Sequence, residues 1–327
     1  MKDETFKRIF TECLFNDLDE EITSPNFRFN IGGVDCVSRG SIVAIAGKPG
    51  VGKSTAIAIL AGVLLGKGEF GKMKCKNKVA QILWVDTEKD AFSCKQRTKT
   101  LRNVAGLDKD KTLFDQYVHF LRFSNKSVKE RFEWLEKYAN NSKYAYDAIF
   151  IDGIFDLTED ADKDFMPIID MLKKLSYGGA TVFAMLHTNK QADDDNMRYA
   201  LGTELQRICT NRFTIKYDKS KDCHNICHEK SNDTQLAPTV SFRFDENGIA
   251  MPLESADDKK HRVNENFKND FKKIFAGGEK MSYTELVKKV CKVSNIGESM
   301  AKKRISKGDK DGYLLHDDEG KYCFKEK

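Results

Sequence analysis

The sequence predicts an α/β protein with a doubly wound, mostly parallel sheet, followed by a small C-terminal domain of helices and a hairpin. Three observations lead to this fold class. A glycine-rich turn at 47–54 joins an apolar strand to an apolar helix, and further apolar runs alternate with helical segments up to about residue 190. From residue 267 onward the pattern changes to short amphipathic helices with many lysines.

Length and composition agree with two domains. The chain has 327 residues, enough for roughly two domains of about 150 residues each, and 40% of its residues are hydrophobic. We expect an N-terminal helix and linker at 1–26, the α/β domain at 27–254, a linker at 255–266 and the C-terminal domain at 267–327.

The composition also favours a cytoplasmic protein without a membrane segment. The longest apolar runs, such as 55–65, are too short to cross a bilayer, and the charged start Met1-Lys2-Asp3-Glu4 lacks the apolar region of a secretory signal. Nine cysteines lie scattered without a paired framework, which is typical of reduced thiols.

Residues 1–15 are expected to form a short amphipathic helix. The apolar residues recur at the spacing of one helical face: Phe6, Ile9, Phe10, Cys13 and Leu14. That face could cover the helix's own domain or dock on a neighbouring subunit, and the sequence favours neither.

The segment 41–55 has the form of a phosphate-binding loop, or P-loop. An apolar strand leads into Gly-x-x-x-x-Gly-Lys-Ser at 47–54, and an apolar helix follows, which is the context that the motif requires. Its glycines let backbone N–H groups converge on a phosphate, and the positive end of the helix adds to the attraction. We expect Lys53 to reach the β- and γ-phosphates of a nucleoside triphosphate, and the Ser54 hydroxyl to bind Mg²⁺. The predicted nucleotide-binding residues are Gly47, Lys48, Pro49, Gly50, Val51, Gly52, Lys53, Ser54 and Thr55.

The apolar run 79–85 predicts a strand buried on both faces, and it ends in Asp86-Thr87-Glu88. A carboxylate at the tip of a central parallel strand lies where such sheets bind ligands. Glu88 is therefore our candidate for the base that orients and deprotonates the attacking water. The alternative is a helix N-cap box in which Thr87 is the capping residue.

Two further strands end in polar residues. The run Ala148-Ile149-Phe150-Ile151-Asp152 has the pattern of a Walker B strand, so Asp152 is expected to hold Mg²⁺ opposite Ser54. The run 181–186 ends in His187-Thr188-Asn189, which places His187 beside the nucleotide as a γ-phosphate sensor. A helix-capping or core histidine is the alternative.

This set of motifs resembles the RecA-type ATPases: a P-loop, an Asp-Thr-Glu strand tip, a Walker B strand and a strand ending in His-Thr-Asn. It is similar, more narrowly, to the plasmid RepA-like and DnaB-like hexameric helicases, and the segment Leu201-Gly202-Thr203-Glu204-Leu205 is similar to the RepA-like branch. The resemblance covers about 27–250. It implies a RecA-like core, ATP hydrolysis at subunit interfaces, a ring or filament, possible hexamers, and single-stranded DNA at the core.

The resemblance also implies a basic finger that reaches the neighbouring subunit's γ-phosphate. The candidates are Arg212, Lys216 and Lys219, of which we choose Arg212. Lys230 stands where an arginine is expected in related chains, and lysine lacks the planar fork of arginine.

The segment 223–228 contains Cys223, His224, Cys227 and His228. A zinc site would need a second ligand pair on a separate element, and none is evident downstream. We expect a strand or hairpin with reduced thiols and leave metal binding open. The alternating run 240–244 predicts an edge strand, and 245–248 a hairpin turn.

The C-terminal residues account for the net positive charge of the chain. From Lys259 to the end there are 18 Lys and Arg against 11 Asp and Glu, a net charge of +7, whereas the whole chain has +5. Helices are expected at 267–275, after a Ser282 cap completed by Glu285, and at 297–307, followed by a hairpin at 313–324. Three helices and a wing resemble a winged helix-turn-helix that binds duplex DNA. The acidic wing tip keeps a protein-docking module as the alternative.

The leading hypothesis is a DNA-associated ATPase of the RepA/DnaB-like helicase kind, acting in replication or mobilisation of a mobile element. The alternative is a non-helicase, ATP-switched DNA-binding regulator or loader. A signalling ATPase without DNA would show no salt-dependent DNA affinity. A metabolic kinase is disfavoured, because no acceptor-site constellation accompanies the P-loop.

Overall fold

The computed structural model describes residues 25–66, 69–107, 111–140, 145–189, 196–253, 267–317 and 320–325. The chain divides into two compact units, residues 1–253 and 254–327. The predicted N-terminal helix and the predicted linker at 255–266 lie outside the described residues.

A large sheet forms the centre of the first unit. Its nine strands among the described residues have the order β13-β12-β11-β10-β3-β9-β8-β6-β7. The pairs from β10 to β7 are all parallel, whereas β10 to β13 are antiparallel. The strands are β3 (Ile42–Gly47), β6 (Ile82–Asp86), β7 (Val118–Arg122), β8 (Ala148–Asp152), β9 (Thr181–His187), β10 (Asn211–Asp218), β11 (Cys223–Ser231), β12 (Val240–Phe244) and β13 (Ala250–Leu253).

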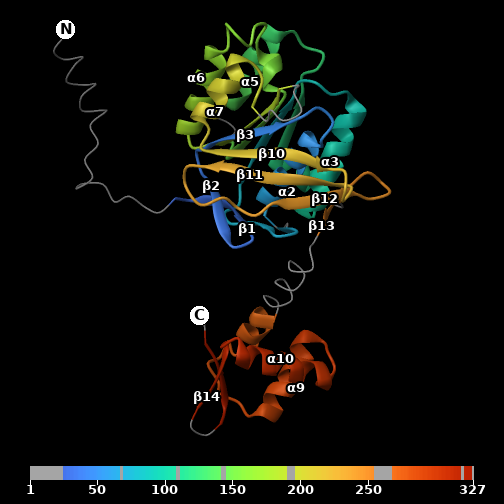
Figure 1. Cartoon of the computed structure of the whole chain (residues 1–327), viewed down its shortest axis with the longest axis vertical. Helices are drawn as coiled ribbons and strands as arrows, with labels where there is room; N and C mark the ends of the chain where they lie inside the picture. The colour runs from blue at the N-terminus through green and yellow to red at the C-terminus, as the bar shows by residue number, and fades with distance from the viewer. Residues whose placement is uncertain are drawn as a thin grey trace, which may run out of the picture. The chain divides into compact units, whose positions relative to one another are not determined.

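Helices cover both faces of this sheet (Figure 1). One face packs against α2 (Lys53–Leu64) and α3 (Ala91–Ala105), and the other against α5 (Val128–Ala139), α6 (Met166–Tyr177) and α7 (Tyr199–Ile208). A short 3-10 turn, η1 (Ile154–Leu157), follows β8. The α/β class and the mostly parallel central sheet are therefore confirmed.

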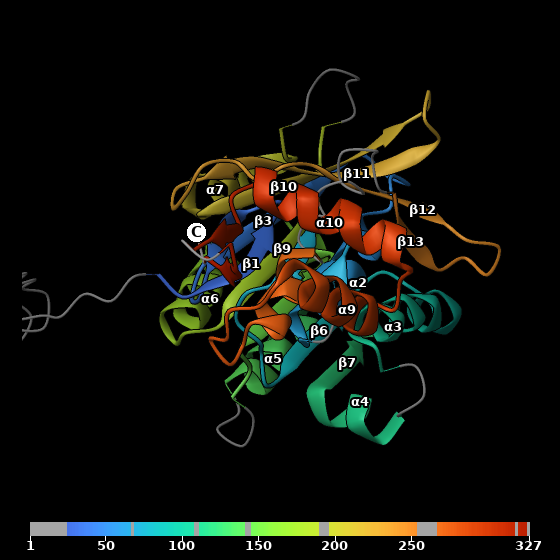
Figure 2. The same cartoon turned by 90° about the horizontal axis from the view of Figure 1, so that it is seen from below.

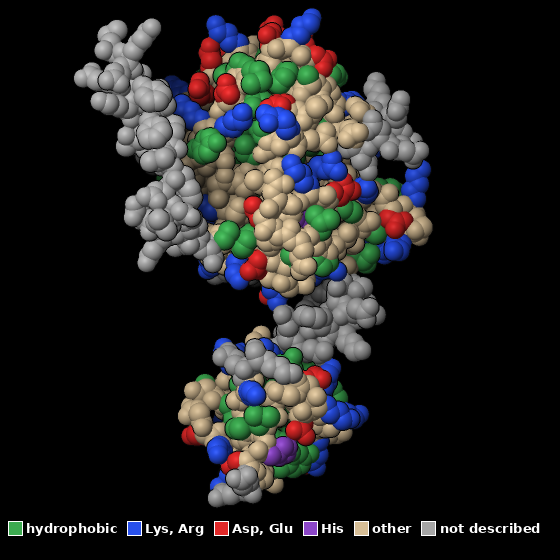
Figure 3. All heavy atoms as spheres, turned by 60° about the vertical axis from the view of Figure 1, so that its left-hand side comes forward, with side chains coloured by type: hydrophobic (Ala, Val, Ile, Leu, Met, Phe, Trp, Pro, Cys, Tyr) green, Lys and Arg blue, Asp and Glu red, His purple; other side chains and the backbone are tan. Residues whose placement is uncertain are grey.

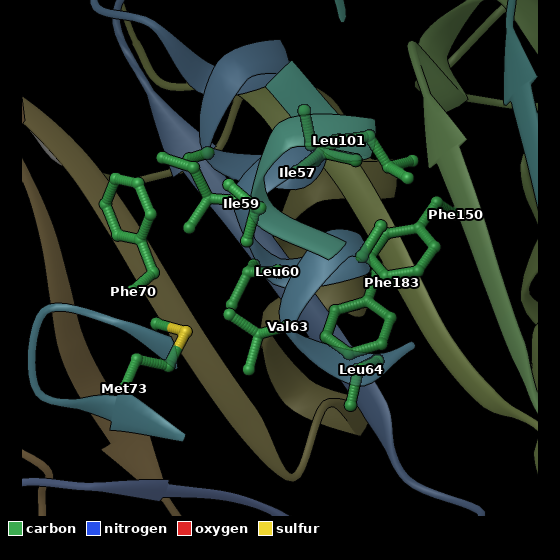
Figure 4. Packing of buried hydrophobic residues seen from close by; sticks show 14 of the residues in the cluster. Ile57, Ile59, Leu60, Val63, Leu64, Phe70, Met73, Leu101, Phe150 and Phe183 are labelled. Atoms are coloured by element: carbon green, nitrogen blue, oxygen red, sulfur yellow. The ribbon is translucent and has the colours of Figure 1, made fainter. Parts of the chain in front are cut away.

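Helix α2 is the most deeply buried helix of the first unit, because all of its residues are buried. Figure 4 shows its side chains between those of the neighbouring elements. Behind it, Phe150 of β8 stacks on Phe183 of β9 with ring centroids 4.3 Å apart. Apolar packing on every side fixes the helix, and so fixes the loop that precedes it.

Several elements were not predicted. A second, four-stranded sheet has the order β2-β1-β5-β4, and helix α4 (Lys111–Tyr117) lies beside β7 (Figure 2). The strand predicted at 240–244 is confirmed as β12, but its edge position was wrong, because β13 pairs with β12 and forms the edge instead. The strands of the second sheet are β1 (Phe27–Ile31), β2 (Val34–Ser38), β4 (Glu69–Phe70) and β5 (Met73–Cys75).

The second unit contains helices and one hairpin. Residues 267–274 are helical, and α9 (Tyr283–Ser294), α10 (Glu298–Lys310), β14 (Leu314–His316) and β15 (Tyr322–Phe324) follow. The predicted capping box is confirmed, since Ser282 and Glu285 each accept the other's backbone N–H. Figure 3 shows Lys and Arg side chains spread over the visible face of this unit, with acidic side chains between them.

The described helices include none with the length and apolarity that a bilayer crossing requires.

Candidate functional site

Strand pairing brings the predicted site residues other than Arg212 to one end of the large sheet. Gly47 of β3 pairs with His187 of β9, and Asp86 of β6 pairs with Asp152 of β8. A cavity of about 190 Å³ lies at this end, lined by the P-loop together with Glu88 and His187. The carboxyl ends of parallel strands are where α/β sheets bind ligands.

The P-loop ends at Gly52, which is the N-cap residue of α2 and has a φ of 89°. Only glycine adopts this conformation without strain. A Cβ at this position would also lie 3.1 Å from His224 Nδ1 and 3.3 Å from Phe242 Cζ. The turn therefore needs glycine for two reasons: its backbone angle, and the lack of room for a side chain beside the His224 and Phe242 rings.

The Lys53 amine lies inside this site. Its Nζ donates to the Lys48 carbonyl at 2.7 Å and lies 2.8 Å from His187 Nδ1. Burial lowers the pKa of Lys53 to about 8, although Glu88 and Asp152 oppose the shift. A bound phosphate would bring negative charge to this amine and so favour its protonated form.

Asp152 is fully buried at the end of β8, and burial raises its pKa to about 7. Asp86 raises it further, whereas the Ser54 hydroxyl favours the charged form. Neither carboxylate oxygen of Asp152, nor Thr55 Oγ1, has a hydrogen bond that meets ordinary geometry within the described residues. Buried carboxylate and hydroxyl oxygens beside a P-loop are the ligands that Mg²⁺ prefers, so these residues fit a magnesium ion.

Glu88 is held on a loop that Asp86 organises. Asp86 Oδ1 accepts the backbone N–H groups of Glu88 at 3.0 Å and Lys89 at 2.8 Å. The Glu88 carboxylate lies 3.1 Å from Lys89 Nζ and 3.7 Å from His187 Nε2. His187 first, and Lys89 with it, lower the pKa of Glu88 to about 2 despite burial. Glu88 is therefore ionised at neutral pH, as a group that takes a proton from water must be.

Thr87 connects the Glu88 loop to the end of β8. Its hydroxyl lies 2.9 Å from the Gly153 carbonyl and 2.9 Å from the Asp156 carboxylate. It does not cap α3, because Asp90 is the N-cap and accepts the Ser93 N–H at 2.7 Å. The alternative interpretation of Thr87 as a helix cap was wrong.

Gly153 lies against the Thr87 hydroxyl, and this close contact leads to a prediction for Gly153→Ala. A Cβ there would lie 2.2 Å from Thr87 Oγ1, at a φ of 98°. We expect a destabilisation of about 2 to 4 kcal/mol, since left-handed strain and overpacking add. Thermal melting measures it. Gly248→Ala is the matched control, with a φ of 73° and open space around the Cβ. Equal losses in both variants would show that the contact with Thr87 contributes nothing.

Arg97 is a functional candidate that sequence reasoning missed. It comes from α3 and lines the same cavity as Lys53 and Ser54. Its charge favours the ionised form of Asp152, and its Nε is buried without a hydrogen bond in the described residues. No local pattern in the sequence indicates that the Arg97 side chain points toward the P-loop.

The predicted finger residue Arg212 is engaged within its own chain. Its guanidinium donates to Gln206 Oε1 at 2.7 Å and to Glu229 Oε2 at 3.0 Å. Lys216 pairs with the same carboxylate at 2.8 Å. Neither partner of Arg212 is one of the predicted nucleotide-binding residues, so this chain alone does not bring Arg212 to its own P-loop.

Lys230 binds backbone carbonyls of its own chain. Its Nζ donates to the carbonyls of Gln206 at 2.8 Å and Cys209 at 2.7 Å. These carbonyls belong to the C-terminal end of α7, where a cation is favourable.

The cysteines and histidines of β11 do not form a metal site. The described residues contain no group of three or more His, Cys, Asp or Glu side chains placed to hold an ion. His228 instead contacts Asn211 Oδ1 at 3.0 Å and accepts the Ala237 N–H at 3.0 Å. His224 lies 2.9 Å from the Val51 carbonyl of the P-loop.

One family model and several solved structures are similar to this chain. The model of a family described as an AAA domain matches residues 4–193. The flagellar accessory protein FlaH from Methanocaldococcus jannaschii is 14% identical, with 68% of this chain and 92% of that chain covered and a TM-score of 0.46. A KaiC-like protein from Pyrococcus horikoshii is 15% identical, with 69% and 99% covered and a TM-score of 0.47. No curated protein matches.

Proposed function

The chain belongs to the AAA domain family, and we propose that it is an ATP-hydrolysing, DNA-associated motor of the RepA/DnaB-like helicase kind, acting on a mobile element. One observation carries the proposal of ATP hydrolysis. The strands bring Lys53, Glu88 and His187 into one cavity beside the buried Asp152. These are the groups that phosphoryl transfer to water requires: a phosphate-binding amine, a carboxylate for the water and a metal ligand.

Each residue would have one role in hydrolysis. The P-loop and Lys53 bind and orient the phosphates, and Ser54 and Asp152 hold Mg²⁺, which neutralises phosphate charge when bound. Glu88 accepts a proton from the attacking water, and its position depends on Asp86 and Thr87. The His187 ring lies between Lys53 and Glu88: its Nδ1 is 2.8 Å from Lys53 Nζ, and its Nε2 is 3.7 Å from Glu88 Oε1. It is therefore placed to sense whether Lys53 is engaged by a phosphate.

We propose that the protein acts as an oligomer, in a ring or filament, with a basic finger supplied across the interface. Arg212 is our candidate, and it would have to exchange Gln206 and Glu229 for the neighbour's phosphate. Because Glu229 also pairs with Lys216 at 2.8 Å, the carboxylate would keep one cationic partner after that exchange. The added positive charge would offset charge that develops in the transition state.

The C-terminal unit is proposed as a winged helix that binds duplex DNA. Its support is the order of three helical segments and a hairpin, and the net charge of +7 from Lys259 onward. Lys302 pairs with Glu298, but Lys303 on the same helix is exposed. The eight cysteines of the described residues are not joined in disulfides, as is typical of proteins in the reducing cytoplasm that we propose as the location.

The same unit favours a second candidate function, an ATP-switched DNA-binding regulator or loader. In that case ATP would drive assembly, and the C-terminal unit would select the DNA. Slow hydrolysis without strand separation would distinguish it from a motor.

The test is the ATPase rate with and without single-stranded DNA, on protein sized by light scattering in Mg²⁺-ATP. We expect a hexamer whose hydrolysis single strands stimulate several-fold, because the resemblance to hexameric helicases implies single-stranded DNA at the core of the ring. A small oligomer that ignores single strands and binds duplex in a salt-dependent way would favour the regulator. No ATP hydrolysis under any of these conditions would contradict both functions.

A further inference from the structure

Four aromatic rings form a cluster beside the P-loop. Tyr217 comes from β10, His224 from β11, and Phe242 and Phe244 from β12. The His224 ring lies 4.9 Å from Tyr217, 5.0 Å from Phe242 and 5.2 Å from Phe244, measured between centroids. These three antiparallel strands pair in sequence, so the sheet itself assembles the cluster.

The cluster is attached to the phosphate-binding loop through His224. A ring nitrogen of His224 lies 2.9 Å from the Val51 carbonyl within that loop. Its ring stacks on Phe242, at an angle of 17°, and Phe242 is completely buried. His224 and Phe244 line the cavity that Lys53 and Glu88 also line. The rings and the phosphate site therefore belong to one continuous surface.

Two rings of the cluster remain exposed. Phe244 is 42% exposed and Tyr217 is 41% exposed, although both are large and contact other rings of the cluster. The cavity volume of about 190 Å³ is below the roughly 300 to 1,000 Å³ typical of small-molecule sites. A nucleoside triphosphate held by its phosphates in the cavity must therefore extend beyond it. Phe244 lines the cavity, and Tyr217 joins the same ring cluster through His224.

We propose that Phe244 and Tyr217 form the nucleobase subsite of this protein, and that His224 fixes its position relative to the P-loop. The inference rests on the proposed ATP-binding function. Base–aromatic stacking accepts every base, because each base has a π-face, and larger rings overlap more. The substrate class is therefore purine nucleoside triphosphates, with pyrimidine triphosphates bound more weakly.

The experiment compares the binding of ATP, CTP and inorganic tripolyphosphate to the full chain by calorimetry, in the presence of Mg²⁺. Tripolyphosphate has the phosphates but no base. The variants are Phe244→Ala and Tyr217→Ala, and Phe92→Ala is the control, since Phe92 is 70% exposed on α3 and is not among the residues that line the cavity. Melting curves compare the folding of the variants.

We expect Phe244→Ala to weaken ATP binding about tenfold, from the usual cost of losing one stacking ring, and to leave tripolyphosphate binding unchanged. Tyr217→Ala should act in the same direction, and Phe92→Ala should have no effect. Wild-type protein should bind ATP more tightly than CTP.

Two results would overturn the base subsite. Unchanged ATP affinity in both ring variants would do so, and so would equal losses of ATP and tripolyphosphate affinity in Phe244→Ala. Failure of the proposed function would look different, because wild-type protein would then bind neither ATP nor tripolyphosphate.

Discussion

Lys53→Ala should abolish ATP hydrolysis. The amine is the cation at the centre of the cavity, and it contacts both the P-loop through the Lys48 carbonyl and the sensor candidate His187. Removing a cation that stabilises transferring phosphate charge costs about 10³-fold or more in turnover. Phosphate release at saturating Mg²⁺-ATP, with and without single-stranded DNA, measures the effect.

A folding defect must be separated from this loss. The lysine carries a pKa lowered by burial to about 8, so its replacement removes a partly desolvated amine and costs the fold little. Melting of the variant should therefore stay close to that of wild type. Lys99→Ala, on an exposed position of α3, is the control and should hydrolyse ATP normally. DNA-stimulated hydrolysis that survives in Lys53→Ala would refute the assignment of the P-loop.

Glu88→Gln should separate ATP binding from ATP turnover. Glutamine keeps the shape of the side chain but carries no charge, so it cannot take a proton from the attacking water. We expect turnover to fall about 10²- to 10⁴-fold, the usual contribution of a general base. Affinity for ATP should be retained, because the P-loop and Lys53 are unchanged. Single-turnover kinetics and equilibrium ATP binding report the two quantities separately.

The matched control for this change is Glu133→Gln. Glu133 lies on α5, where its exposed carboxylate forms an i,i+4 pair with Lys129, and such pairs contribute little. The control should turn over ATP at the wild-type rate. If Glu88→Gln also kept that rate, another group would have to be the base, and Asp86, which holds the Glu88 loop, would be the next residue to test.

The residues that the sequence identified share a physical property, since each lies on a strand or on the segment that follows one. Lys53 and Ser54 follow β3, Glu88 follows β6, and Asp152 ends β8. An apolar run followed by a polar residue signals a buried parallel strand and its carboxyl end, and such ends meet at one edge of the sheet. The α/β class and the cluster of these residues could therefore be predicted without coordinates.

Other parts of the fold lacked a local signal. The strands β4 and β5 contain only two and three residues, too few for a period to be recognised. The edge of the large sheet was misplaced because alternation in 240–244 does not reveal that β13 adds outside it. Pairing between strands depends on the partner as well as on the strand itself.

The sequence by itself determined the P-loop, the central parallel strands that alternate with helices, and the carboxylates that end those strands, because these are encoded within short stretches of chain. Only the tertiary structure decided that Arg97 lines the phosphate cavity, that Arg212 pairs with Glu229, and that His224 contacts Val51. These contacts join side chains from separate elements. Their geometry is set by how α3, β11 and β12 pack on the P-loop strand and helix, which no local pattern specifies.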